Sequence, residues 1–181
     1  SCIGFGAFIA MFGRATERPL DFWTPTKIAL TAGTWTLGVA FQALVYPMLD
    51  DRTVVRADLD DRHCRMWTAR SNHFGWSAYL GAEPGSEGVG EYAAPARREG
   101  LTGLPPTWVG VGTCDLFHDE DVAYADRLAD AGVPCELHVT PGGYHAFDLL
   151  QAKAGVSKAF RASYVAALRA ALLDDPPARP S

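Results

Sequence analysis

Hydrophobic and polar positions alternate most regularly in the last part of the chain. Residues 107–113 form a short apolar run introduced by two prolines, and residues 135–139 alternate in polarity, so both predict strands. Between them, apolar residues at helical spacing predict a helix that Asp119 caps and Gly132 ends. A strand, a helix and a second strand in this order imply a parallel sheet covered by helices. The predicted fold class is therefore α/β.

The other segments are less regular. Residues 39–46 predict another buried strand, and apolar residues at helical spacing predict a final helix over residues 152–173. Residues 50–100 are charged and rich in glycine and proline. We expect them to form a long surface excursion with short helices at most, one of them near residues 74–80.

The N-terminal residues 2–12 are almost wholly apolar. This stretch is shorter than the roughly 20 apolar residues that span a bilayer. It also lacks the basic segment that precedes the apolar part of a secretory signal. We predict a buried helix or strand, or an exposed apolar segment, and no membrane span; an interfacial role is the less favoured alternative.

Composition narrows the possible partners. The 181 residues are 48% hydrophobic and carry a formal net charge of -5, so one core is expected and no basic field is present to hold nucleic acid. The four cysteines lie far apart, which favours reduced thiols in a cytoplasmic protein. Cys135 and His138 are three residues apart on one predicted strand and face opposite sides, so no metal site is predicted, and no cofactor.

Candidate chemistry lies on two loops that follow the predicted strands. Asp115 comes directly after the first strand, and His145 comes directly after the second. If these strands are parallel neighbours, both side chains emerge at the same rim of the sheet. A carboxylate beside an imidazole is the orienting part of a nucleophile–histidine–acid triad. The simpler alternatives are a turn or capping aspartate and a hydrogen-bonded loop histidine, and His118 is a second, less favoured base.

A family resemblance is carried by the segment LPPTWVGVGTCDLFHDEDVAYADRLADAGVPCELHVTPGGYHAFD and by ALVYPMLDDR, SNHFGWSAYLG and YAAPAR. These segments resemble the C-terminal portion of α/β-hydrolases of the hormone-sensitive-lipase-like carboxylesterase family. The resemblance implies a partial α/β-hydrolase fold, with a mostly parallel sheet flanked by helices. It also implies hydrolysis of short acyl esters, with Asp115 as the triad acid and His145 as the general base. Asp119 and Glu120 look like the acidic pair that begins the family's helix, which we interpret as capping.

The sequence departs from this family in its nucleophile. It contains neither the Gly-x-Ser-x-Gly elbow nor the HGGG-type oxyanion loop. Residues 27–33 are similar to the nucleophile strand, but Trp35 then occupies the serine position. We therefore predict an atypical N-terminal segment over residues 1–38, the C-terminal part of a hydrolase domain over residues 39–175, and a tail over residues 176–181.

Two functions follow from these departures. The first is a carboxylesterase whose serine is absent here, so that the chain hydrolyses esters poorly or not at all. The second is a catalytically inactive α/β scaffold that binds a partner, with a homodimer formed through the apolar N-terminus as one form of it. A broken reading frame is a third, weaker alternative. Four aromatic residues of the excursion, Trp67, Phe74, Trp76 and Tyr79, either line a substrate pocket or cover the sheet edge, and Phe74 and Trp76 are the preferred substrate-binding candidates.

Overall fold

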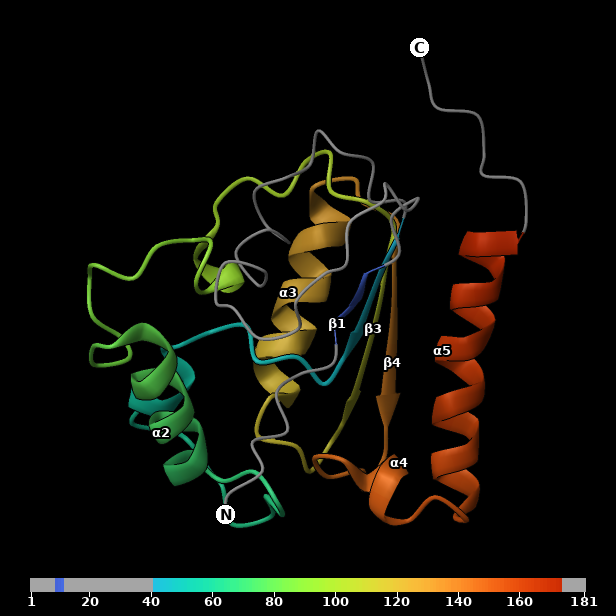
Figure 1. Cartoon of the computed structure of the whole chain (residues 1–181), viewed down its shortest axis with the longest axis horizontal. Helices are drawn as coiled ribbons and strands as arrows, with labels where there is room; N and C mark the ends of the chain where they lie inside the picture. The colour runs from blue at the N-terminus through green and yellow to red at the C-terminus, as the bar shows by residue number, and fades with distance from the viewer. Residues whose placement is uncertain (1–8, 12–40, 174–181) are drawn as a thin grey trace, which may run out of the picture.

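The computed structural model describes residues 9–11 and 41–173 of the chain. Its described strands form one sheet in the order β1 (Ile9–Met11), β2 (Gln42–Val45), β3 (Thr107–Gly112) and β4 (Cys135–Thr140) (Figure 1). The last three are parallel, whereas β1 runs antiparallel to β2. The α/β class is thus confirmed, and part of the apolar N-terminal segment is a strand.

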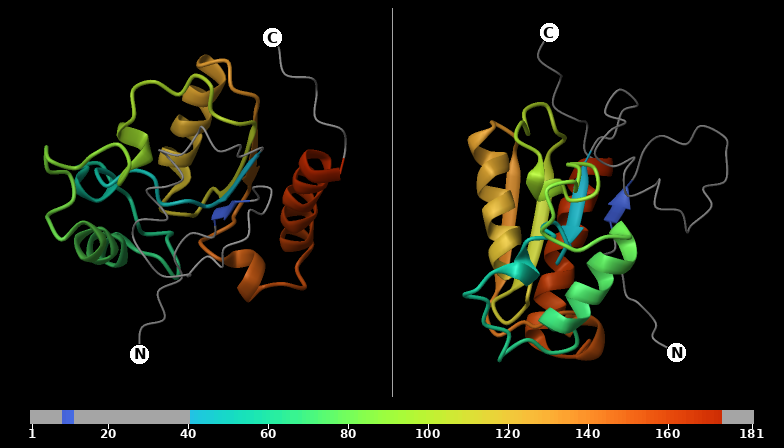
Figure 2. Two further views of the ribbon diagram at one scale, coloured as in Figure 1. Left: turned by 45° about the horizontal axis from the view of Figure 1, so that its top comes forward. Right: turned by 90° about the vertical axis from the view of Figure 1, so that its left-hand side faces the viewer.

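Helices cover both faces of this sheet. In Figure 1, α3 (His118–Asp130) lies on one side of the strands and α5 (Gly155–Leu173) on the other, and the second view in Figure 2 agrees. Each helix closes a separate hydrophobic cluster. The cluster under α3 contains Leu44, Leu49, Leu101, Leu104, Val109, Tyr124, Ala125, Leu128 and Val133. The cluster under α5 contains Tyr46, Trp108, Val111, Phe147 and Phe160.

The excursion between β2 and β3 contains one α-helix, α2 (Ala69–Leu80), and two single turns of 3-10 helix, η2 (Thr53–Val55) and η3 (Pro95–Arg97). The start of α2 was predicted too late. Thr68 caps the helix, because its hydroxyl accepts a hydrogen bond from the backbone N–H of Ser71 at 3.3 Å.

The two ends of α3 test the capping predictions. At the C-terminal end, Gly132 has a φ of 75° and follows the last turn, as predicted. At the N-terminal end the prediction for Asp119 is wrong, since the helix starts after Phe117 and has no side-chain cap. The Asp119 carboxylate instead pairs with Arg56 at 3.2 Å and His118 at 3.0 Å, because it already lies within the first turn.

The C-terminal part holds one more helix than predicted. The short α4 (Phe147–Leu150) precedes α5, which begins a few residues after the predicted start. The predicted strand at residues 27–33, the position of Trp35, the boundary at residue 38 and the tail lie outside the described residues. Among the residues that the structure describes, no helix has the length and apolar character needed to cross a membrane.

Candidate active site

The loops that follow β3 and β4 are joined into one unit. The two strands are in register up to Gly112 and Thr140. Beyond them, the N–H of Thr113 donates to the carbonyl of Thr140 at 3.0 Å, and the N–H of Cys114 donates to the carbonyl of Gly143 at 2.8 Å. A Cβ atom at Gly112 would collide with the backbone of Gly143. The close approach of the loops therefore requires glycine at position 112.

Asp115 and His145 meet at this rim. Nδ1 of His145 lies 3.1 Å from Oδ2 of Asp115, and the exposed fractions of the two side chains are 6% and 0%. The other carboxylate oxygen accepts a hydrogen bond from the N–H of Phe117 at 3.1 Å. An ionised carboxylate only accepts, so the imidazole proton sits on Nδ1 and the lone pair on Nε2. Nε2 is thus the atom that can take a proton from a nucleophile.

In the part of the chain that the structure describes, three aromatic rings contact the imidazole of His145. The ring centroids of Tyr46, Phe117 and Trp67 lie 4.7, 5.4 and 5.7 Å from it. The Tyr46 hydroxyl donates to Oδ1 of Asp148 at 3.0 Å, and burial together with the Asp148 charge raises the pKa of this phenol above its ordinary value. Tyr46 therefore stays a neutral hydrogen-bond donor. Within residues 41–173, the hydrogen bonding of the His145 ring is limited to Asp115.

Two residues with a positive φ lie next to the imidazole of His145. Ala146, the residue after His145, has a φ of 62°, and Tyr46 has a φ of 36°. Residues with a Cβ rarely adopt this left-handed region, and each such residue costs on the order of 1–3 kcal/mol. Tyr46 contacts the imidazole and Ala146 directly follows it, so the strain lies where the ring is held.

The two residues predicted to bind substrate, Phe74 and Trp76, both lie on α2. Phe74 is 72% exposed, whereas Trp76 is 1% exposed and packs on Tyr79 with ring centroids 6.0 Å apart. Within the described part of the chain, neither ring contacts His145, and their role in binding stays a prediction. Trp67, one of the four aromatic residues proposed from the sequence to line a pocket, is the one whose ring contacts His145. Its contact with the imidazole was not predicted.

The competing site residues find other partners. His118 pairs with Asp119 and not with the carboxylate of Asp115. Cys135 packs in the cluster under α3, while the ring of His138 stacks on Trp108 at 6.1 Å, so the two face opposite sides as predicted. In the segments that the structure describes, no three His, Cys, Asp or Glu side chains gather as a metal site. Cys64, Cys114 and Cys135 are free thiols.

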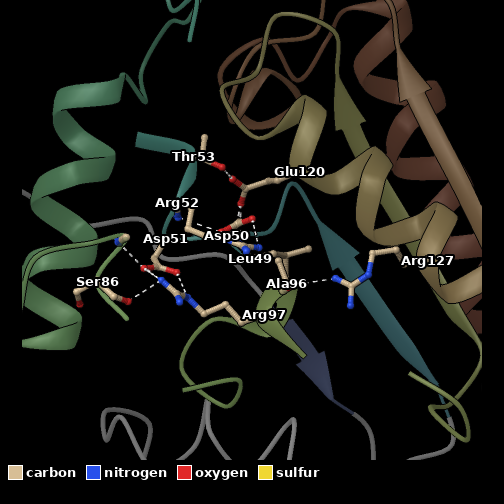
Figure 3. A network of polar contacts seen from close by, with 11 residues as sticks. Leu49, Asp50, Asp51, Arg52, Thr53, Ser86, Ala96, Arg97, Glu120 and Arg127 are labelled. Atoms are coloured by element: carbon tan, nitrogen blue, oxygen red, sulfur yellow. Dashed lines mark hydrogen bonds and ion pairs between the residues drawn. The ribbon is translucent and has the colours of Figure 1, made fainter. Parts of the chain in front are cut away.

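A buried polar network ties the excursion to α3 (Figure 3). Oε1 of Glu120 accepts hydrogen bonds from the backbone N–H groups of Leu49 at 2.7 Å and Asp50 at 3.1 Å, and the hydroxyl of Thr53 donates to Oε2. Burial raises the pKa of Glu120 to about 8 despite these three donors. The interpretation of Glu120 as a helix cap is therefore wrong, because its carboxyl group faces a loop from the distant excursion.

Two arginines complete this network. Arg97 donates through two nitrogens to the fully buried carboxylate of Asp51, at 2.7 and 2.8 Å, and the N–H of Gly85 donates to the same group at 2.6 Å. Although burial opposes it, the pKa of Asp51 is lowered by these hydrogen bonds. Arg127 on α3 donates to the carbonyl of Ala96 at 2.7 Å. The excursion is thus held at both ends of its path over α3.

Asp121 is the one carboxyl group of the α3 first turn that is both fully buried and without a hydrogen-bond partner among the described residues. Burial raises its pKa well above the ordinary value, and the charges of Glu120 and Asp115 add to this. This environment therefore favours the neutral carboxylic acid form of Asp121.

Comparison with known proteins agrees with this architecture. The family model described as alpha/beta hydrolase fold matches residues 25–149. The chain therefore belongs to the α/β-hydrolase family, and within it to the hormone-sensitive-lipase-like esterases.

Particular relatives are esterases. A structure titled bacterial heroin esterase is 36% identical with a TM-score of 0.72, and esterase LipW from Mycobacterium marinum is 31% identical with a TM-score of 0.72. Each comparison covers 82% of this chain and 47% of the other. Esterase LipI from Mycobacterium tuberculosis is 44% identical over 45 residues, which are 25% of this chain and 14% of LipI. The chain thus spans about half the length of these solved structures.

Proposed function

We propose that this chain carries the acid and base of a carboxylesterase site that acts on small acyl esters. The observation that carries the proposal is the 3.1 Å contact between Nδ1 of His145 and the buried carboxylate of Asp115, at the ends of adjacent parallel strands. The relatives named as esterases support the reaction class. Asp115 would be the triad acid and His145 the general base.

The geometry supports different roles for Asp115 and His145. Asp115 holds the imidazole in the tautomer that leaves Nε2 free, and it stabilises the ring when it becomes charged. Nε2 of His145 takes the proton of an attacking hydroxyl and later returns a proton to the leaving alcohol. Because the carboxylate is fully buried, its attraction to the charged imidazole is stronger than in water. The attacking hydroxyl is not assigned to a residue, since the sequence contains no Gly-x-Ser-x-Gly.

The acid–base pair is tested by proton NMR on the full chain. We expect a strongly deshielded Nδ1 proton that disappears in His145→Gln and in Asp115→Asn. Retention of this signal in Asp115→Asn would refute the proposal, because the two groups would then not be coupled. A fluorophosphonate probe and a short-chain nitrophenyl ester test the nucleophile. We expect no stoichiometric labelling and negligible turnover, and labelling would show that an unconventional nucleophile completes the site.

The absent serine motif favours one second candidate, an inactive scaffold that binds an ester-like ligand or a second copy of the chain. The free thiols at Cys64, Cys114 and Cys135 suit a cytoplasmic location for either function. Light scattering and ligand titration test the scaffold. A strict monomer that binds no short-chain ester analogue would count against it.

A further inference from the structure

One hydrogen bond does not fix the orientation of an imidazole. The bond from Nδ1 of His145 to Asp115 restrains a single ring atom, and the ring can still swing about that contact. Packing against the ring faces and edges must supply the remaining restraint. Tyr46 and Phe117 meet the imidazole edge-on, with interplanar angles of 65° and 80°, whereas the plane of Trp67 is tilted by only 38°. Of the three rings, Trp67 is therefore the one whose plane is closest to parallel with the imidazole.

Trp67 is itself held from behind by α2. Its indole Nε1–H donates to Oδ1 of the buried Asn72 at 3.2 Å. Its Cζ2 atom lies over Gly75, where an added Cβ would be only 3.3 Å away. Two residues earlier, the guanidinium of Arg65 lies 5.8 Å from the ring centroid of Tyr144, the neighbour of His145. The segment from Arg65 to Trp67 thus bridges α2 and the loop of the base.

The three rings differ in what supports them. Tyr46 follows β2 and is fixed by its N–H bond to Gly110 at 2.7 Å, and Phe117 belongs to the Asp115 loop. Of the three, Trp67 alone comes from the excursion over residues 50–100 and is supported by α2. The contact between Trp67 and His145 therefore links the packing of the excursion to the orientation of the imidazole.

We propose that Trp67 is a positioning residue for His145: its indole, held by Asn72 and Gly75, limits the swing of the imidazole away from Asp115 and keeps water from their hydrogen bond. The proposal rests on the function proposed above. It predicts that displacing the indole loosens the His145–Asp115 contact without removing either partner.

The test is the rate at which the Nδ1 proton of His145 exchanges with water, measured by NMR on the full chain. In Trp67→Ala we expect exchange to become about tenfold faster, and Trp67→Phe should restore most of the protection. Phe74→Ala is the matched control, because Phe74 is an exposed aromatic residue on α2 and makes no ring contact with His145 within the described residues. It should exchange like the unmodified chain.

Gly75→Ala separates positioning from folding. Alanine favours a helix by up to about 1 kcal/mol over glycine, yet here its methyl group would press on the indole at 3.3 Å. We expect faster exchange of the Nδ1 proton with no loss of stability in urea unfolding. This variant also keeps the proposal testable if Trp67→Ala does not fold.

The outcomes distinguish this proposal from the proposed function. If Asp115→Asn abolishes the Nδ1 signal while Trp67→Ala and Gly75→Ala leave the exchange rate within about twofold, the positioning role is refuted and the acid–base pair stands. An equal acceleration in Phe74→Ala would also refute the positioning role. If Asp115→Asn leaves the signal in place, the proposed function itself fails.

Discussion

At the scale of single residues, Gly112 determines whether the loops after β3 and β4 can meet. We predict that Gly112→Ala destabilises the chain by roughly 2–3 kcal/mol, because its Cβ would collide with the backbone of Gly143 and force the loops apart. The same variant should lose the Nδ1 proton signal of His145. Urea unfolding and proton NMR measure the two effects.

Gly155→Ala is the control for this substitution. Gly155 is the first residue of α5, and an added Cβ there would meet no described atom within 4 Å apart from its chain neighbours and the backbone of its own helix. We expect its stability to stay within about 1 kcal/mol of the unmodified chain. A Gly112→Ala chain as stable as this control would show that the loops tolerate separation.

Glu120 is the residue at which pH should act on stability. Its pKa is raised from 4.5 to about 8 in the fold, so between these values the folded chain holds a proton that the unfolded chain has released. Stability contributed by this group is complete below pH 4.5 and is lost as the pH rises through about 8. The slope is at most about 1.4 kcal/mol per pH unit for one proton. Unfolding by urea at a series of pH values measures it.

Glu120→Gln should flatten this dependence, because a neutral amide still accepts the hydrogen bonds of Leu49 and Asp50. Asp121→Asn is the companion variant, since the pKa of Asp121 is raised in the same direction and contributes a slope of the same sign. Acids with lowered pKa values, such as Asp51 and Asp119, act in the opposite sense and only at acid pH. An unchanged slope in Glu120→Gln would contradict our assignment.

At the scale of elements, the excursion is held against the domain by the Asp51–Arg97 pair. Arg97→Met leaves the fully buried Asp51 carboxylate without its guanidinium, and we predict a loss of about 3–5 kcal/mol. The double variant Asp51→Asn, Arg97→Met should recover part of this loss. Urea unfolding compares both with the unmodified chain.

Arg62→Gln provides the control for a surface pair. The side chains of Arg62 and Asp60 are 81% and 46% exposed, so breaking their contact should leave the urea unfolding midpoint unchanged. An equal loss in Arg62→Gln and Arg97→Met would mean that burial does not decide the strength of these pairs.

The elements that could be predicted are those whose ends are marked by local sequence signals, such as a proline before a strand or a glycine after a helix. The strands β3 and β4 and the end of α3 at Gly132 followed from local pattern, and the meeting of Asp115 with His145 followed from parallel order. The role of Glu120 and the contact of Trp67 did not follow. Both depend on how the excursion packs against residues that are distant in the sequence, and the spacing of nearby residues does not predict such contacts.

At the scale of the whole molecule, the sheet separates two hydrophobic clusters. Leu128 lies in the cluster under α3 and Phe160 in the cluster under α5, and both are fully buried. We predict that Leu128→Val and Phe160→Leu each cost about 1–2 kcal/mol. Their effects should add to within about 0.5 kcal/mol in the double variant, because the sheet lies between them.

The control for this prediction is a pair of residues that lie on the same face of the sheet. The rings of Phe147 and Phe160 lie 5.1 Å apart in the cluster under α5. Phe147→Leu combined with Phe160→Leu should therefore depart from additivity by about 0.5–3 kcal/mol, since one substitution changes the packing space of the other. If the Leu128–Phe160 pair couples as strongly, the two layers act as one core, and the rim that holds Asp115 and His145 would respond to packing changes on either face.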